Sequence, residues 1–186
     1  MRRTLAGRGL IILDRDGVIN HDSDNFVKSA DEWRPIPGSM RAIAALSEAG
    51  YTVTIASNQS GLARGRFDRG ALQAMHRKLR RLVSREGGRI DRIVVCPHGP
   101  NDGCSCRKPK PGLLHRLGRY YDTGLSGVPV VGDSLRDLQA AASAGARPIL
   151  VRTGNGKKTE AALGREFAAT EVFDDLAAAA AALVKE

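Results

Sequence analysis

Aromatic residues, long apolar runs and scattered cysteines are what this chain has little of. Phe, Trp and Tyr make up only 4% of its 186 residues, which leaves few rings on which nucleic acid bases could stack. No apolar run is long enough to cross a bilayer. Residues 1–4 are not followed by the apolar core of a signal sequence. We therefore expect a cytoplasmic protein with no membrane partner.

Charge is the most uneven feature of the composition. Lysine and arginine outnumber aspartate and glutamate by 29 to 20, for a formal charge of +9, which suits either nucleic acid or small phosphorylated anions. The densest cationic run, residues 76–85, is interleaved with apolar residues at helical spacing, namely Leu72, Met75, Leu79 and Leu82. This pattern predicts an amphipathic helix whose cations face solvent. With so few aromatic rings, we expect a small phosphorylated substrate and no nucleic acid partner.

Strand-like and helix-like segments alternate along the chain. The alternation predicts an α/β fold with a doubly wound, Rossmann-like parallel sheet and right-handed crossovers. The predicted strands are residues 10–13, 51–56, 93–96, 128–131 and 148–151, and the predicted helices are residues 39–49, 69–86, 113–121, 135–144 and 176–184. Gly50 and Gly145 stand where helices commonly stop. The length suits a single domain over residues 1–186, with little room for a second, cap domain.

Polar residues follow three of the predicted strands, at the edge of a parallel sheet where ligands bind. Asp14 and Asp16 follow the first strand, Ser57 the second, and Asp133 the strand at residues 128–131. Of two carboxylates one residue apart, one can attack phosphorus while the other moves the proton. The Ser57 hydroxyl and nearby N–H groups can hold phosphate oxygens. Lys108 supplies a cation, and Asp133 suits Mg²⁺.

All three cysteines lie in one short loop, residues 96–106. Cys96, Cys104 and Cys106 together with His98 make a tetrahedral zinc set. An odd number of clustered thiols argues against a disulfide framework, and four protein ligands leave no open position on the metal. We therefore expect a structural zinc ion, inserted just before Arg107 and Lys108, that fixes these two long side chains. The alternative is three reduced cysteines and a surface histidine in a polar loop.

The order of the strand-end motifs resembles the haloacid dehalogenase superfamily of phosphotransferases over residues 10–153. With the zinc loop included, the whole chain resembles the D-glycero-D-manno-heptose 1,7-bisphosphate 7-phosphatase family, in the capless, histidinol-phosphatase-like branch of that superfamily. The segments that carry this resemblance are residues 14–20, 57–65, 96–98, 104–112 and 131–134. The resemblance implies a haloacid dehalogenase-like fold and a Mg²⁺-dependent phosphoric monoester hydrolase. The enzyme would remove the C7 phosphate of the heptose bisphosphate through an aspartyl phosphate, in ADP- or GDP-heptose synthesis for bacterial surface polysaccharide.

The resemblance also implies the roles of individual residues. Asp14 would be the nucleophile and Asp16 the general acid and base, while Ser57 and Lys108 stabilise the phosphoryl group and Arg107 recognises substrate. Mg²⁺ would be held by Asp14, the backbone carbonyl of Asp16, and Asp133. The other expected substrate-binding residues are Asp22, Ser23, Asp24, Asn25, Asn58, Gln59 and Ser60. Some family members carry a lysine where this chain has Ser134, so a substrate contact at this position is left open.

Three alternative functions share parts of this pattern. Histidinol-phosphate phosphatase has the same motifs and a similar zinc loop, although the Ser-Gly-Leu-Ala-Arg-Gly sequence at residues 60–65 favours the heptose enzyme. The positive charge is compatible with a polynucleotide 3′-phosphatase. A non-catalytic, zinc-stabilised binding module is the third, and the intact Asp14, Asp16, Lys108 and Asp133 argue against it. We expect a monomer, and the C1 anomer of the sugar is left open.

Overall fold

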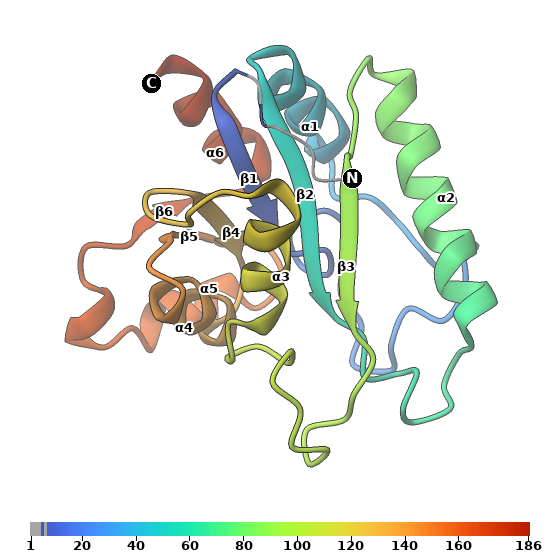
Figure 1. The fold of residues 1–186 in the computed structure, drawn as a ribbon. Helices are drawn as coiled ribbons and strands as arrows, with labels where there is room; N and C mark the ends of the chain where they lie inside the picture. Colours follow the sequence, from blue (N-terminus) through green and yellow to red (C-terminus); the bar gives the residue numbers. More distant parts are fainter. Residues whose placement is uncertain (1–4, 6) are drawn as a thin grey trace.

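One parallel sheet organises the computed structural model, which describes residue 5 and residues 7–186. Its six strands have the order β3-β2-β1-β4-β5-β6 (Figure 1). Residues 1–4, to which the expectation of no signal sequence applies, lie outside the described residues. The strands are β1 (Gly9–Leu13), β2 (Tyr51–Asn58), β3 (Arg92–Cys96), β4 (Pro129–Gly132), β5 (Arg147–Val151) and β6 (Glu171–Phe173).

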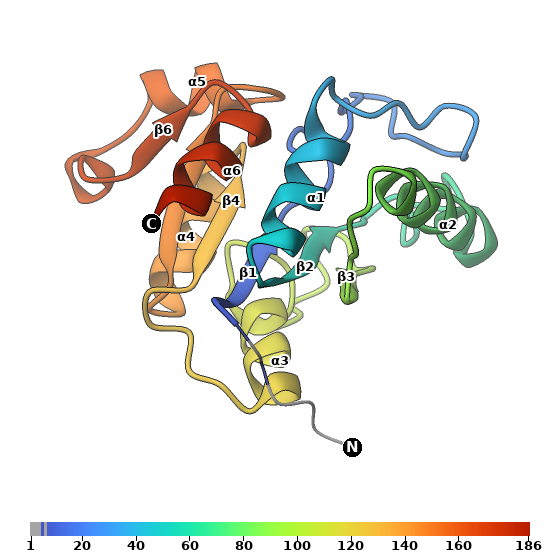
Figure 2. The ribbon, with the colours of Figure 1, turned by 90° about the horizontal axis from the view of Figure 1, so that it is seen from above.

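Helices cover both faces of this sheet (Figure 2). They are α1 (Ser39–Glu48), α2 (Arg69–Arg85), α3 (Gly112–Tyr121), α4 (Leu135–Ser143), α5 (Gly156–Ala161) and α6 (Leu176–Lys185), with a 3₁₀ turn at Arg165–Phe167. Alternate residues of β1 point to opposite faces. Ile11 and Leu13 pack with α1, α2 and α6, whereas Leu10 and Ile12 pack with α3 and α4. The doubly wound α/β fold predicted from the sequence is therefore confirmed.

The five predicted strands and five predicted helices are all present, and the sequence pattern missed three short elements. β6 has three residues and α5 six, and the 3₁₀ turn is also short. Segments of this length carry too few residues to show a hydrophobic period. β2 is longer than predicted and ends at Asn58, so Ser57 lies within the strand. None of the described helices combines the length and apolarity that a membrane crossing requires.

The cationic helix α2 differs from its predicted form in two ways. Its buried face ends in Val83, whereas Leu82 is only partly buried. Lys78 does not point freely into solvent, because its ammonium donates to the carbonyl oxygens of Ala30 and Trp33 at 2.6 and 2.8 Å. It therefore ties α2 to the loop that follows β1. Arg77 and Arg81 are exposed, as predicted.

The strand order creates the place where a ligand can bind. The chain runs from β1 to β2 and β3 on one side, and then returns to add β4 on the other side of β1. Loops after β1 and β4 leave in opposite directions, which opens a crevice at the carboxyl ends of these strands. The Asp14 N–H donates to the Val131 carbonyl at 2.8 Å and joins the two strand ends. Gly17 has a φ of 82°, and a Cβ there would collide with the Asp133 carboxylate.

Candidate active site

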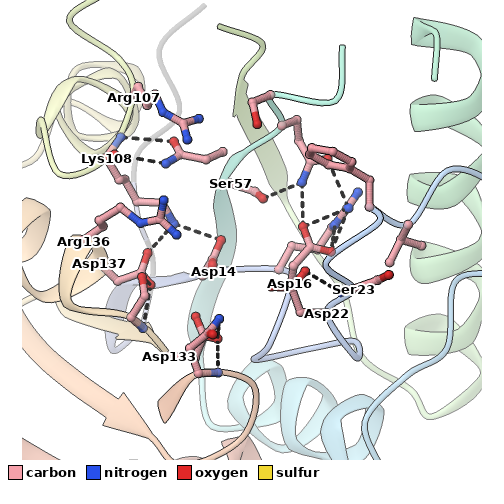
Figure 3. Close-up of a pocket in the computed structure, with 18 of the residues that line it drawn as sticks. Asp14, Asp16, Asp22, Ser23, Ser57, Arg107, Lys108, Asp133, Arg136 and Asp137 are labelled. Atoms are coloured by element: carbon pink, nitrogen blue, oxygen red, sulfur yellow. Dashed lines mark hydrogen bonds and ion pairs between the residues drawn. The ribbon is translucent and has the colours of Figure 1, made fainter. Parts of the chain in front are cut away.

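A cavity opens at the carboxyl ends of β1, β2 and β4, where the sequence motifs converge (Figure 3). The predicted site residues that line it are Asp14, Asp16, Asp22, Ser23, Ser57, Asn58, Gln59, Ser60, Arg107, Lys108 and Asp133. Two predicted substrate residues, Asp24 and Asn25, line a neighbouring hollow with Arg64 and Arg66 instead. Motifs up to 119 positions apart in the sequence, at Asp14 and Asp133, thus share one cavity.

Three carboxylates meet on one side of the cavity. Oxygen atoms of Asp14, Asp133 and Asp137 lie within 4.8 Å of one another. Burial raises the pKa of the Asp14 carboxyl to about 8, despite the attraction of the Lys108 ammonium. Burial also raises the pKa of Asp133 to about 6, and the charge of Asp137 adds to this effect. Since clustered carboxylates favour a hard divalent cation, this donor set fits Mg²⁺.

Asp133 is held in place by the segment that leads into α5. Its Oδ2 accepts hydrogen bonds from Asn155 N at 2.8 Å and from Asn155 Nδ2 at 3.2 Å. Its backbone carbonyl accepts from the Thr159 hydroxyl at 2.9 Å. Among the described residues no donor contacts Oδ1, so one oxygen of this buried carboxylate can reach a cation. The short helix that the sequence pattern missed therefore orients a predicted metal ligand.

Lys108 is a buried cation placed against the acidic cluster. Its Nζ lies 2.9 Å from Asp14 Oδ1 and 2.5 Å from Asp137 Oδ1, and it donates to the Ala56 carbonyl at 2.9 Å. Burial by itself lowers the pKa of Lys108, but the two carboxylates outweigh burial and raise it. Asn58 bonds the lysine's backbone N–H and C=O through its side-chain amide, both at 3.1 Å. The lysine is thus fixed and charged beside Asp14.

Asp16 faces away from the other carboxylates and toward Arg15. The Nη2 atom of Arg15 donates to both Asp16 oxygens, at 2.8 and 2.9 Å, and Asn20 and Gln59 also donate to this carboxylate. Burial by itself raises the pKa of Asp16, but the Arg15 guanidinium and these donors lower it overall. Asp16 is therefore ionised and able to accept a proton.

Arg15 is a site residue that the sequence reasoning missed. An arginine between two strand-end aspartates is typical of an exposed loop, yet Arg15 is only 1% exposed. It contacts Gln59 Oε1 at 3.2 Å and lies 3.5 Å from His76 Nε2, on the cationic helix α2. No spacing in the sequence places these groups together, because they belong to three separate elements.

The cysteine loop has the geometry of a metal site. Cys96 Sγ lies 3.6 Å from His98 Nδ1 and 3.7 Å from Cys104 Sγ, while Cys106 Sγ lies 3.3 Å from His98 Nδ1 and 3.7 Å from Cys104 Sγ. Tetrahedral zinc with ordinary bond lengths places such donors about 3.6–3.8 Å apart. The Arg107 guanidinium donates to the His98 carbonyl at 3.3 Å, which ties this arginine to the loop.

Comparisons with known proteins agree with this geometry. A family model described as HAD-hydrolase-like matches residues 105–179. The chain is 56% identical to the D-glycero-beta-D-manno-heptose-1,7-bisphosphate 7-phosphatase of Pseudomonas aeruginosa, over 96% of this chain and 99% of that protein.

Two solved structures of named phosphatases are also similar over almost the whole chain. The D,D-heptose 1,7-bisphosphate phosphatase of Bordetella bronchiseptica, complexed with magnesium and phosphate, matches with a TM-score of 0.93 and 59% identity, over 95% of this chain and 98% of that one. The corresponding enzyme of Burkholderia thailandensis matches with a TM-score of 0.76 and 45% identity, over 96% and 100% of the two chains.

Proposed function

Because the chain belongs to the D-glycero-beta-D-manno-heptose-1,7-bisphosphate 7-phosphatase family, we propose that it removes the C7 phosphate of the β-anomeric heptose bisphosphate. The enzyme is a phosphoric monoester hydrolase with a haloacid dehalogenase-like fold. The observation that carries the proposal is the position of Asp14, which follows the carboxyl end of the central strand β1 and lies beside buried Lys108 and the acidic cluster. The β anomer is proposed because the relatives carry it in their names.

In the first proposed step, Asp14 attacks phosphorus in line with the sugar oxygen. The bond between phosphorus and this oxygen breaks, and the oxygen takes its proton from Asp16 while Asp14 becomes an aspartyl phosphate. Asp16 is ionised in the structure, but the negative charge of an incoming phosphate raises the pKa of a nearby carboxyl. Ser57 and Lys108 stabilise the charge on the transferring group.

In the second step, Asp16 takes a proton from a water molecule, and the resulting hydroxide attacks phosphorus. The bond from phosphorus to Asp14 breaks, inorganic phosphate leaves, and the Asp14 carboxylate is regenerated. Mg²⁺ held by Asp14, Asp133 and the backbone carbonyl of Asp16 would neutralise charge between the Asp14 carboxylate and the phosphate oxygens. The metal would act electrostatically only, and the nucleophile is Asp14.

The remaining predicted residues are proposed to bind the sugar and its second phosphate. Asp22, Ser23, Asn58, Gln59 and Ser60 line the cavity and present hydrogen-bonding groups to a polyhydroxylated substrate. Asp24 and Asn25 belong to the same loop but lie outside this lining, so a direct contact from them requires the loop to move. Arg107 is proposed to bind the part of the substrate that carries the second phosphate. We further propose a monomeric, cytoplasmic enzyme of one domain that acts in ADP- or GDP-heptose synthesis.

The function is tested by comparing kcat/KM for the α and β anomers of the heptose bisphosphate and for histidinol phosphate. We expect the β-bisphosphate to exceed histidinol phosphate by roughly 10- to 100-fold, because one charge-assisted hydrogen bond to a second phosphate contributes about 1.5–3 kcal/mol. Phosphate release in the presence of Mg²⁺ is the measurement. A higher kcat/KM for histidinol phosphate would contradict the proposal and favour the histidine-pathway enzyme.

Zinc in the cysteine loop is proposed to anchor Arg107 and Lys108. Cys104→Ser is expected to lower the zinc content from close to one ion per chain, to lower Tm and to reduce kcat at saturating Mg²⁺. Structural zinc contributes on the order of 10 kcal/mol in small peptides, and a domain with its own core depends on it less. Elemental analysis, calorimetry and phosphate release measure the three effects.

Ser105 provides the matched control for this variant, because it is exposed and lies between two of the ligands. Ser105→Ala should retain its zinc, its Tm and its activity. If zinc-free Cys104→Ser melted like the parent and kept full Mg²⁺-dependent activity, the loop would not anchor the two cations.

A further inference from the structure

Four cations line the active-site cavity: Arg15, Arg107, Lys108 and Arg136. Arg15 and Lys108 already have carboxylate partners. Arg15 binds the Asp16 carboxylate, and Lys108 binds the carboxylates of Asp14 and Asp137. Charge that is already matched within the protein is poorly suited to recruit a second anion. The positive charge that remains in the cavity belongs to the two other arginines.

Arg107 and Arg136 carry guanidinium groups without a carboxylate partner in the described part of the chain. Arg107 donates only to the backbone carbonyl of His98, and Arg136 forms no hydrogen bond or ion pair with any described residue. Two arginines elsewhere in the chain are engaged, since Arg147 and Arg152 each pair with two carboxylates. An unpaired guanidinium that lines a reaction cavity is available for a ligand.

The backbone at Arg136 belongs to a hydrogen-bonded helix start, although its side chain is exposed. Arg136 is the second residue of α4, and Ser134 donates from its N–H and its hydroxyl to Asp137 Oδ2, at 3.1 and 2.5 Å, which closes the start of this helix. Asp137, the nearest acid in sequence, is itself held by Lys108 and Ser134 and does not neutralise Arg136. Figure 3 shows Arg136 entering the cavity from the same side as Arg107 and Lys108.

A second hollow adjoins the reaction cavity at these cations. Pro100, Gly103 and Cys104 of the zinc loop line it, and it shares Arg107, Lys108 and Arg136 with the reaction cavity. The two unpaired guanidinium groups therefore stand where the reaction cavity and the hollow meet. A substrate that extends out of the reaction cavity on this side would therefore pass Arg107 and Arg136.

We propose that Arg136 acts with Arg107 to bind the phosphate that is not cleaved, so that Arg136 is a specificity-determining residue of this chain. The inference rests on the proposed function, since it requires a sugar with two phosphates. Each guanidinium presents a planar pair of N–H donors that matches phosphate oxygens. Two such groups on separate elements, the zinc loop and α4, favour a substrate with a terminal phosphate over one without it.

The test compares Arg136→Ala and Arg136→Lys on two substrates, heptose 1,7-bisphosphate and heptose 7-phosphate. Arg136→Ala should lower kcat/KM for the bisphosphate by roughly 10- to 100-fold, with the larger change in KM. For the 7-phosphate the change should stay within about threefold, as for an ordinary surface substitution. Arg136→Lys should fall between the parent and Arg136→Ala on the bisphosphate. Arg81→Ala, at an exposed arginine of α2 outside the cavity, is the matched control.

Product inhibition gives a second readout, which does not require turnover of the bisphosphate. Heptose 1-phosphate retains the C1 phosphate, so Arg136→Ala should weaken its inhibition of 7-phosphate cleavage by a similar factor. Inhibition by free heptose should not change. Equal losses on both substrates, or an unchanged preference for the bisphosphate, would overturn the role of Arg136.

Failure of this inference can be told apart from failure of the proposed function. If the parent enzyme hydrolyses neither heptose substrate, the proposed function is contradicted and the inference falls with it. If the parent prefers the bisphosphate and Arg136→Ala retains that preference, only the inference is contradicted. A parent that cleaves both heptose substrates equally well would contradict a C1 phosphate site on any residue.

Discussion

Asp14→Asn is expected to lower kcat by roughly 10³-fold or more, as the loss of a catalytic nucleophile does in other enzymes. An amide cannot form the aspartyl phosphate, and it removes one carboxylate from the acidic cluster that would hold Mg²⁺. Phosphate release under saturating Mg²⁺ measures the effect. Mass spectrometry must show that the asparagine has not deamidated back to aspartate. A folded Asp14→Asn protein with near-normal turnover would contradict the covalent mechanism.

Measuring the stability of Asp14→Asn shows whether its activity is lost because the nucleophile is absent or because the protein is unfolded. Burial raises the pKa of Asp14 to about 8, far above its ordinary value of 3.8. The stability associated with a raised pKa is fully present below the unfolded pKa and is lost as pH rises toward the folded pKa. The parent should therefore lose stability between about pH 4 and pH 8 in buffer without Mg²⁺, and Asp14→Asn should lose less over this range. Urea unfolding at several pH values provides the measurement.

Lys108→Met is expected to reduce both stability and activity. Lys108 is 4% exposed and is the cation that pairs with Asp14 and Asp137. Its removal leaves buried carboxylates without a counterion, which commonly costs about 3–5 kcal/mol. Loss of one donor to the transferring phosphate lowers kcat by roughly 10²- to 10³-fold. Methionine retains most of the side-chain volume and removes only the charge and the donor.

Urea unfolding and phosphate release measure the two effects of Lys108→Met. Mg²⁺ should restore part of the stability, since a divalent cation can replace the lost counterion, but it should not restore kcat. Lys157→Met, at an exposed lysine of α5, is the matched control and should change neither quantity appreciably. An active Lys108→Met enzyme would show that Lys108 balances the buried carboxylates without assisting the reaction.

The order of the longer strands and helices was predicted correctly from the sequence, because each is indicated by residues that are close together in the chain. The apolar runs before Asp14 and Asp133 mark buried strands, and Gly50 and Gly145 have the positive φ expected where helices stop. Elements that lack a local signal were missed or misplaced. β6 and α5 are too short to show a period, and Val83 is buried where the spacing favoured Leu82.

The positions of the site residues were predicted more reliably than their partners. Asp14, Ser57, Lys108 and Asp133 were all expected at strand ends or beside the zinc loop, and all of them line the cavity. By contrast, the sequence analysis assigned no role to Arg15, yet it is buried against Asp16. A sequence motif gives the position of a side chain along the chain. The burial and the pKa of that side chain depend on other elements that pack against it in the folded protein.

The amino-acid sequence by itself determined the alternating α/β order, the strand-end carboxylates and the cluster of three cysteines with His98 that could hold a metal ion, because each depends on neighbouring residues in the chain. Only the tertiary structure decided which charged side chains form ion pairs with one another. It placed Lys108 between Asp14 and Asp137, and it left Arg107 and Arg136 without a carboxylate in the described chain. The physical reason is that ion pairing and desolvation act over a few ångströms in space, between elements that the sheet topology brings together.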